Sequence, residues 1–150
     1  MPMDAYILIG NANTRKTSVV RSLTGCFNRS VRDIQLQSNK RPQRFYARVG
    51  TLQITRTSID DFIHEVTRSR CEAVVFCLSP TAYKTDLETF PDAQAYVAAL
   101  RERGWHIKGV AVLGQDGGGV RAPNLRQYTQ APTAPVNLTA RDVRAQFGWL

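Results

Sequence analysis

The 150-residue sequence has few cysteines, few histidines and no long apolar run. Its 3 cysteines are an odd number in a chain long enough to bury a core, so we expect no disulfides and a cytoplasmic location. No apolar stretch approaches the roughly 18 residues of a membrane helix, and no basic segment followed by an apolar one opens the chain. These absences argue against a membrane span, export, a disulfide-stabilised mini-protein and an obvious zinc site.

Positive charge is concentrated in the first half of the chain. Residues 1–70 contain 12 Lys and Arg against 5 Asp and Glu, whereas residues 71–150 contain 8 against 7. This asymmetry favours an anionic partner for the first half, such as a nucleotide, a nucleic acid or an acidic protein surface. A solvated basic face that keeps the protein soluble explains the asymmetry equally well.

Short apolar runs alternate with helical patterns along the chain. Continuous apolar runs, typical of strands buried on both faces, occupy residues 5–9, 73–78 and 107–113. Apolar residues at helical spacing occupy residues 16–23, 59–70, 87–103 and 139–147. Gly25 is expected to end the first of these helices, Ser58 to cap the second, and Pro91 to open the regular part of the third. Alternating patterns predict an antiparallel hairpin from residues 33–37 and 45–55, with a bulge at Gly50. Residues 116–135 are expected to be irregular, followed by a short last strand at residues 135–138.

This order of elements predicts an α/β fold that forms a single domain over residues 1–150. Helices should cover both faces of a mostly parallel sheet, giving a three-layer sandwich in which the hairpin adds one antiparallel edge strand. Ligands of such folds bind beyond the carboxyl ends of the strands. Residues 10–17, 79–85 and 114–119 are therefore expected to share one functional rim.

The segment after the first strand nearly fulfils the phosphate-loop (Walker A) pattern, in which glycine, four residues and a second glycine precede lysine and serine or threonine. It departs only at the second glycine, which is Arg15. In such a loop, backbone N–H groups surround a phosphate, the lysine reaches the terminal phosphates and the next hydroxyl binds Mg²⁺. An ordinary strand-turn-helix junction is the competing interpretation. The nucleotide-binding candidates are Gly10, Asn11, Ala12, Asn13, Thr14, Arg15, Lys16, Thr17 and Ser18, with Thr17 also the candidate metal ligand.

Residues 10–25, which read GNANTRKTSVVRSLTG, resemble the opening of translation-factor-class GTPases. The likeness is greatest to the G domains of ferrous-iron transporter B and of the ribosome-assembly GTPases. The order of the expected elements also matches a Ras-like G domain over nearly the whole chain. The resemblance implies a P-loop NTPase topology of the Ras-like kind, and GTP or ATP with Mg²⁺ as the cofactor.

The sequence departs from the GTPase pattern at three places that concern the same ligand. Arg15 replaces the loop glycine, where it could strain the backbone, add a cation to the phosphates or fill the pocket. Arg56 stands where the family has the aspartate that positions Mg²⁺, and a cation there repels the metal. The base-recognition motif (N/T)KxD lacks its lysine and its spacing, which leaves only Asp116 to pair with a base amine.

These departures favour a degenerate G-domain-like module, a pseudo-GTPase that binds a nucleotide or serves as a scaffold for a protein partner. Because phosphoryl transfer depends on a metal and on electrostatic clamps, hydrolysis should be weak or absent, and the module could also have no cofactor at all. One alternative is an active NTPase or small-molecule kinase with a rearranged metal site. The other is a basic RNA-binding module that stacks bases on Phe45 and Tyr46 of the hairpin, although Phe45 facing the core is the competing interpretation.

Overall fold

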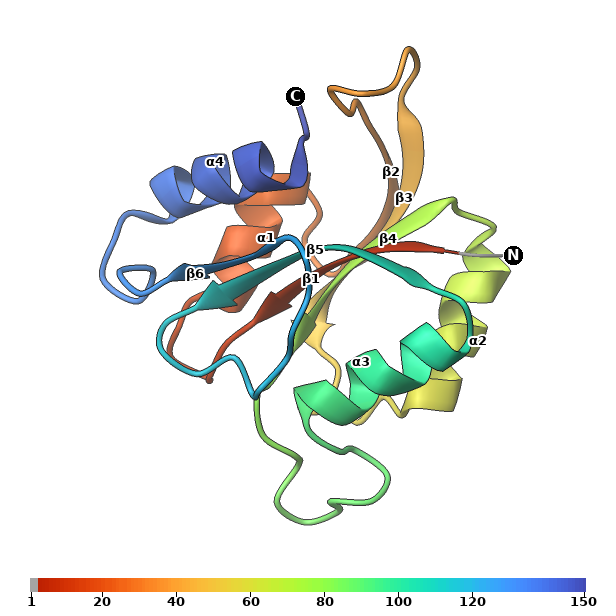
Figure 1. Ribbon diagram of the computed structural model, residues 1–150, viewed down its shortest axis with the longest axis vertical. Coiled ribbons are helices and arrows are strands. Elements are labelled where there is room, and N and C mark those ends of the chain that lie inside the picture. Colours follow the sequence, from red (N-terminus) through yellow and green to blue (C-terminus); the bar gives the residue numbers. More distant parts are fainter. Residues whose placement is uncertain (1–2) are drawn as a thin grey trace.

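A six-stranded sheet forms the centre of the computed structural model, which describes residues 3–150 (Figure 1). The strand order is β2-β3-β4-β1-β5-β6, and all neighbouring strands are parallel except the antiparallel pair β2 and β3 at one edge. The strands are β1 (Asp4–Ile9), β2 (Arg29–Ile34), β3 (Gln43–Thr51), β4 (Ala73–Leu78), β5 (His106–Leu113) and β6 (Leu125–Tyr128). The helices are α1 (Lys16–Thr24), α2 (Ile59–Ser69), α3 (Ala93–Glu102) and α4 (Val136–Phe147).

Helices cover both faces of the sheet, with α1 and α4 on one side and α2 and α3 on the other (Figure 1). Because successive side chains of a strand point to opposite faces, β1 contributes to both layers of core. Tyr6 and Leu8 pack toward α1 and α4, whereas Ile7 and Ile9 pack toward α2 and α3. The predicted α/β class, with a mostly parallel sheet and one antiparallel edge strand, is confirmed.

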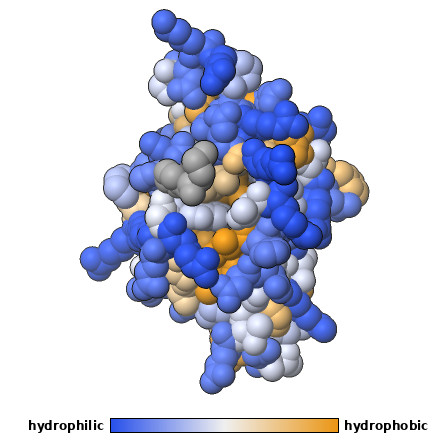
Figure 2. All heavy atoms as spheres, turned by 90° about the vertical axis from the view of Figure 1, so that its right-hand side faces the viewer, coloured by the Kyte–Doolittle hydropathy of each residue, from blue (hydrophilic) through white to orange (hydrophobic). Residues whose placement is uncertain are grey.

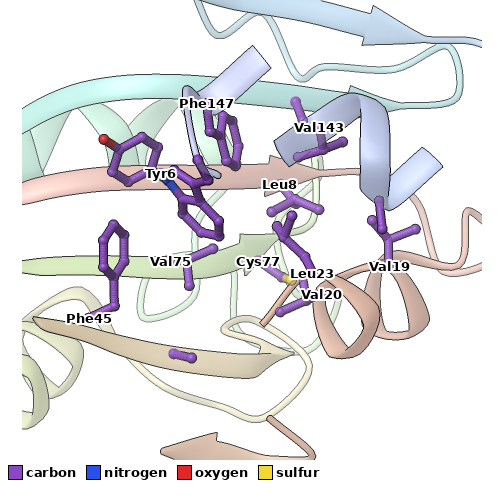
Figure 3. Close-up of a cluster of buried hydrophobic side chains, with 14 of the residues drawn as sticks. Tyr6, Leu8, Val19, Val20, Leu23, Phe45, Val75, Cys77, Val143 and Phe147 are labelled. Carbon is purple, nitrogen blue, oxygen red and sulfur yellow. The ribbon is translucent and has the colours of Figure 1, made fainter. Parts of the chain in front are cut away.

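Aromatic rings dominate the core layer between the sheet and α1 and α4 (Figure 3). The rings of Tyr6, Phe45, Phe147 and Trp149 lie with centroids between 4.9 and 5.4 Å apart. Trp149 is only 2% exposed, so the end of the chain packs back onto the sheet. Val19, Val20 and Leu23 bury α1 in the same core layer, beside Leu8, Cys77 and Val143 in Figure 3, and so hold the helix whose first turn follows the candidate phosphate loop.

The ends of α1 and α2 follow from their sequences. Gly25 ends α1 in the left-handed conformation at φ 72°, which is the usual role of a glycine after a helix. Ser58 caps the start of α2, because its hydroxyl accepts a hydrogen bond of 3.2 Å from the N–H of Asp61. Both helix boundaries agree with the sequence prediction.

The hairpin differs from its prediction at both strands. The first strand was expected at residues 33–37, but β2 begins earlier and pairs Ser30 with Ala47. Leu36 instead forms an isolated bridge with Trp149. The bulge expected at Gly50 coincides with an irregularity in the pairing of β3 and β4, whose register shifts between Ala47 and Thr51. The expected strand to residue 55 is wrong, since the chain turns after Thr51.

The C-terminal third also differs from its prediction. The helical pattern was expected over residues 87–103, with Pro91 opening its regular part. Helix α3 begins at Ala93, two residues after Pro91, where the carboxylate of Asp92 accepts from the N–H of Ala95 at 2.9 Å. A last strand at residues 135–138 is wrong, because α4 already starts at Val136 and buries Thr139, Ala140 and Val143 on one face. The last strand is β6, which lies inside the segment expected to be irregular. Its residues are largely exposed and polar, so no alternation revealed it.

Strand β4 lies between β3 and β1 in the sheet. In a Ras-like sheet the inner strand of the hairpin pairs with the strand before the phosphate loop, so the strand order differs from the predicted Ras-like topology here. Six residues of β1 pair with β4, from Asp4 with Ala73 to Ile9 with Leu78. The chain that follows β4, and not the chain that follows β3, therefore lies beside Gly10, whose N–H donates to the carbonyl of Leu78 at 3.2 Å.

The sequence predicted no disulfides, no membrane helix and no export signal. Cys26, Cys71 and Cys77 are buried free thiols, in agreement with the expectation of no disulfides. Within residues 3–150, no helix has both the length and the apolar character needed to cross a membrane. Met1 and Pro2, on which the expected lack of an export signal partly depends, lie outside the described residues.

Candidate functional site

A pocket of about 840 Å³ opens at the carboxyl edge of the sheet. The helices that follow β1 and β4 pack on opposite faces of the sheet (Figure 1), so the connections after these neighbouring strands diverge. Such a point of divergence is where ligands of open α/β sheets usually bind. All three segments expected to share a rim contribute to the pocket. Its lining includes Asn11, Ala12, Asn13, Thr14 and Lys16 from the first, Ser79 and Thr81 to Thr85 from the second, and Gly114 and Gln115 from the third.

Gly10 allows the chain to turn tightly after β1. A Cβ atom at this position would lie 2.4 Å from the hydroxyl of Thr14 and 2.9 Å from the carbonyl oxygen of Leu113, so no other residue fits without a shift. Thr14 closes the turn, because its N–H and its hydroxyl both donate to the carbonyl of Asn11, at 3.2 and 2.7 Å. The first glycine of the motif therefore has a steric reason in this structure.

Arg15 occupies the position of the missing glycine in the conformation that glycine favours. Its backbone is left-handed, with φ 63° and ψ 27°. Its exposed side chain points out of the loop, and Nη1 donates to the carbonyl of Ala134 at 3.3 Å. Of the three possibilities left by the sequence, backbone strain is present and filling of the pocket is wrong, because Arg15 does not line it.

Arg15→Gly is expected to raise the free energy of unfolding by about 0.5–1 kcal/mol, because it removes the side chain from a left-handed position. Arg70→Gly is the matched control, since Arg70 has φ 58° at the end of α2 and should gain a similar amount. Urea denaturation measures both. A loss of stability in Arg15→Gly alone would mean that the contact with Ala134 outweighs the strain.

Lys16 lies at the bottom of the pocket as a buried cation. Only 6% of the residue is exposed, and Nζ donates to the carbonyls of Gly10 at 2.7 Å and Asn11 at 3.4 Å. Burial lowers the pKa of Lys16, and the neighbouring Cys77 opposes this effect. No carboxylate of residues 3–150 forms an ion pair with it. A buried charge without a counter-ion is unfavourable, so an anion in the pocket would relieve it.

The first turn of α1 adds unpaired backbone donors to the same place. No side chain caps this helix, and its first turn contains no acidic residue. Within the described part of the chain, no group accepts a hydrogen bond from the N–H groups of Asn13, Lys16 and Thr17. The N-terminus of a helix carries a partial positive charge, so these donors and the ammonium of Lys16 favour an anion together.

Five of the predicted site residues do not line the pocket: Gly10 and Arg15, described above, and Thr17, Ser18 and Asp116. Thr17 is half-buried and Ser18 is exposed, and both lie on the first turn of α1 outside the lining. Asp116 is exposed, and its carboxylate accepts from the N–H of Gly118 at 2.8 Å. The neighbouring Gly114 and Gln115 take its place at the pocket, so base pairing by Asp116 finds no support in the geometry.

Gln53 is a pocket residue that the sequence analysis missed. It is 1% exposed, and its Nε2 donates to the carbonyls of Ser79 at 2.9 Å and Pro91 at 3.2 Å. Its Oε1 accepts from the N–H of Ser79 at 2.9 Å. One side chain thus ties together both ends of residues 79–92, the segment that forms the second wall. No sequence signal pointed to this role, because Gln53 falls within the strand expected at residues 45–55.

Tyr83 is held on this wall by contacts from two directions. Its N–H donates to the carbonyl of Phe90 at 2.9 Å, and the two rings meet edge to face at 5.8 Å. The guanidinium carbon of Arg56 lies 5.8 Å from the centroid of the Tyr83 ring. Thr85 and then Arg56 lower the pKa of Tyr83. Arg56 therefore reaches the rim of the pocket through Tyr83.

The positive charge of the pocket lining favours anions, as do the free backbone N–H groups at the start of α1. Its lining contains Lys16 and Lys84 but no aspartate, glutamate or histidine. Among the described residues, no group of three or more His, Cys, Asp or Glu side chains is placed to hold a metal ion. The lining suits a phosphate, and it offers no carboxylate or imidazole to act as an acid or base next to one.

The basic hairpin of β2 and β3 extends from the body at the top of the view in Figure 2, which shows hydrophilic side chains there. Phe45 is completely buried and Tyr46 is 7% exposed, so neither ring can stack on a base. The aromatic part of the RNA-binding hypothesis is therefore wrong. The cations Arg29, Arg32, Lys40, Arg41 and Arg44 are exposed.

Comparison with known proteins does not assign the chain to a family. No family model, no curated protein and no solved structure matches the chain. The support for any function therefore comes from the residues of this chain and their geometry.

Proposed function

We propose that this protein binds a phosphate-bearing ligand, and best a nucleotide, in the pocket beside residues 10–17. The observation that carries the proposal is the buried ammonium of Lys16, which has no counter-ion and lies beside the uncapped first turn of α1. A phosphate at this place would receive hydrogen bonds from the backbone and from the ammonium, and it would neutralise the buried charge.

A nucleotide fits the pocket better than a free phosphate. The volume of about 840 Å³ is in the range of sites for whole small molecules. Beyond Lys16, apolar and aromatic surface from Ile54, Tyr83 and Pro132 lines the walls, and it suits the flat face of a base. Gln115 and Thr129 add polar groups for the edge of the ring.

The same site supports binding better than turnover. Phosphoryl transfer needs a metal ion and a group that positions the attacking nucleophile, and the lining offers no carboxylate for either task. The likeness of residues 10–25 to GTPases supports descent from a phosphate-loop protein, whereas the strand order differs from a Ras-like sheet. The proposal is thus a degenerate nucleotide-binding module that acts through a protein partner, with little or no hydrolysis.

Calorimetric titration with GTP, GDP, ATP and ADP, each in a buffer free of phosphate and sulfate, tests this proposal. We expect at least one nucleotide to bind with a stoichiometry of one, and protein denatured after purification to release that nucleotide for identification by mass spectrometry. No heat from any of the four, together with no released nucleotide, would make the protein a purely structural scaffold.

A steady-state phosphate-release assay separates binding from turnover. We expect no signal above that of the Lys16→Ala variant, because no carboxylate is available to position a metal or a water molecule. Turnover that depends on both Lys16 and Thr17 would instead establish the alternative of an active NTPase or kinase.

A further inference from the structure

We infer, on the basis of the proposed function, that the pocket holds its phosphate ligand without a divalent cation, and that Lys84 and Arg56 supply the positive charge that Mg²⁺ supplies in GTPases. The inference concerns the same ligand and states that it binds as the free anion, without Mg²⁺. It follows from which side chains face the pocket and from what the acidic side chains around it already do.

The side chains at the pocket do not fit Mg²⁺. Proteins bind this ion through one or two carboxylates together with the phosphates and water, and no carboxylate lines the pocket. The hydroxyl of Thr17, which the resemblance assigns to the metal, is also outside the lining.

The acids on the surrounding segments are engaged elsewhere. Asp86 accepts from the N–H of Thr89 at 3.1 Å, and Asp92 caps α3 through the N–H of Ala95 at 2.9 Å. Asp116 accepts from Gly118 as described, while Glu88 is exposed and does not line the pocket.

Two cations lie at the wall of the pocket formed by residues 79–85. Lys84 lines the pocket, whereas Arg56 does not line it and lies against the ring of Tyr83, which does. The backbone of Arg56 is fixed at φ 54° in a tight turn, where its N–H donates to the carbonyl of Gln53 at 3.1 Å. Because Gln53 also holds both ends of residues 79–92, the arginine and the wall form one unit. Like charges repel, so these cations disfavour Mg²⁺ and favour the bare phosphate.

Nucleotide affinity measured in EDTA and in millimolar MgCl₂ tests the inference. The probes are GTP, GDP, ATP and ADP, and the wild-type protein is titrated by calorimetry. We expect affinity in EDTA to equal or exceed that in MgCl₂, because Mg²⁺ competes with the protein for the phosphates. Binding at least about tenfold tighter in MgCl₂ would overturn the inference and leave the proposed function intact. Absence of binding in both solutions would overturn the proposed function itself.

Variants of Arg56 test the assignment of the positive charge. Arg56→Gln should lower affinity in EDTA by about threefold to tenfold, and Arg56→Asp by more. Arg68→Gln is the matched control, because it removes an exposed arginine from the far end of α2. Thermal unfolding shows whether each variant is folded. If a variant is not folded, the titrations of the wild-type protein in EDTA and in MgCl₂ still decide whether Mg²⁺ is needed for binding. Unchanged affinity in folded Arg56→Gln would contradict the role of Arg56.

Discussion

Glu65→Ala is expected to lower the free energy of unfolding by about 3 kcal/mol or more, because it leaves a buried guanidinium without its partner. Arg48 is 4% exposed, and its Nη1 donates to Glu65 at 2.8 Å. Its Nη2 donates to the hydroxyls of Thr55 at 3.0 Å and Thr57 at 2.8 Å. The hydroxyl of Tyr46 also donates to Glu65, and burial and this carboxylate raise the pKa of Tyr46 to about 12.

Chemical denaturation measures the stability of Glu65→Ala and of a double variant, with Asp60→Ala as the matched control. Asp60→Ala removes a carboxylate from the same helix, but its ion pair with Arg103 is exposed, so a change within about 0.5 kcal/mol is expected. The double variant Arg48→Met, Glu65→Leu should recover much of the stability, since it removes both buried charges. Equal losses in Glu65→Ala and Asp60→Ala would contradict this account of the cluster.

Lys16→Met is expected to lower nucleotide affinity at least tenfold, or by about 1.4 kcal/mol or more, without lowering the stability of the unliganded protein. The ammonium is buried at a cost and has carbonyl oxygens as its only partners among the described residues. Methionine fills similar space without a charge. Lys108→Met, which alters an exposed lysine of β5, is the control and should leave affinity unchanged.

The pH dependence of stability provides a second readout for Lys16. Its pKa in the folded protein is below its ordinary value of 10.5, so the unfolded chain binds more protons between the two values. The contribution of Lys16 to stability therefore rises with pH across that window. The difference in stability between the wild type and Lys16→Met should shift in favour of the wild type as pH increases through it. A difference that does not vary with pH would mean that the lysine is not perturbed.

Local patterns in the sequence predicted the elements, but not how the strands are ordered. The apolar runs became β1, β4 and β5, and Ser58 and Gly25 marked helix ends, because these signals act over a few residues. The pairing of β4 with β1 joins residues far apart in the sequence, such as Asp4 and Ala73, which no local pattern records. Strand β6 was missed since its four residues are mostly exposed and carry no alternation.

Much of the candidate site was predictable, because the carboxyl ends of parallel strands meet at one edge of the sheet. Residues 10–16 could be found from the spacing of Gly10 and Lys16, and the rim prediction also placed Tyr83, within residues 79–85, at the pocket. Gln53 reaches the pocket through the fold, and its residue type carries no signal of binding. The αL backbone of Arg15 shows why the glycine could be lost without blocking the pocket, an outcome the sequence left open.

Titration of ¹⁵N-labelled protein with ADP or GDP, followed by two-dimensional ¹H–¹⁵N NMR, tests the central claim that the backbone of residues 13–18 binds phosphate. The account predicts that the largest amide shifts occur at these residues and at Gly114, and that inorganic phosphate shifts the same amides more weakly. Binding with shifts confined to the basic hairpin, or no shifts at residues 13–18 at saturating nucleotide, would contradict it.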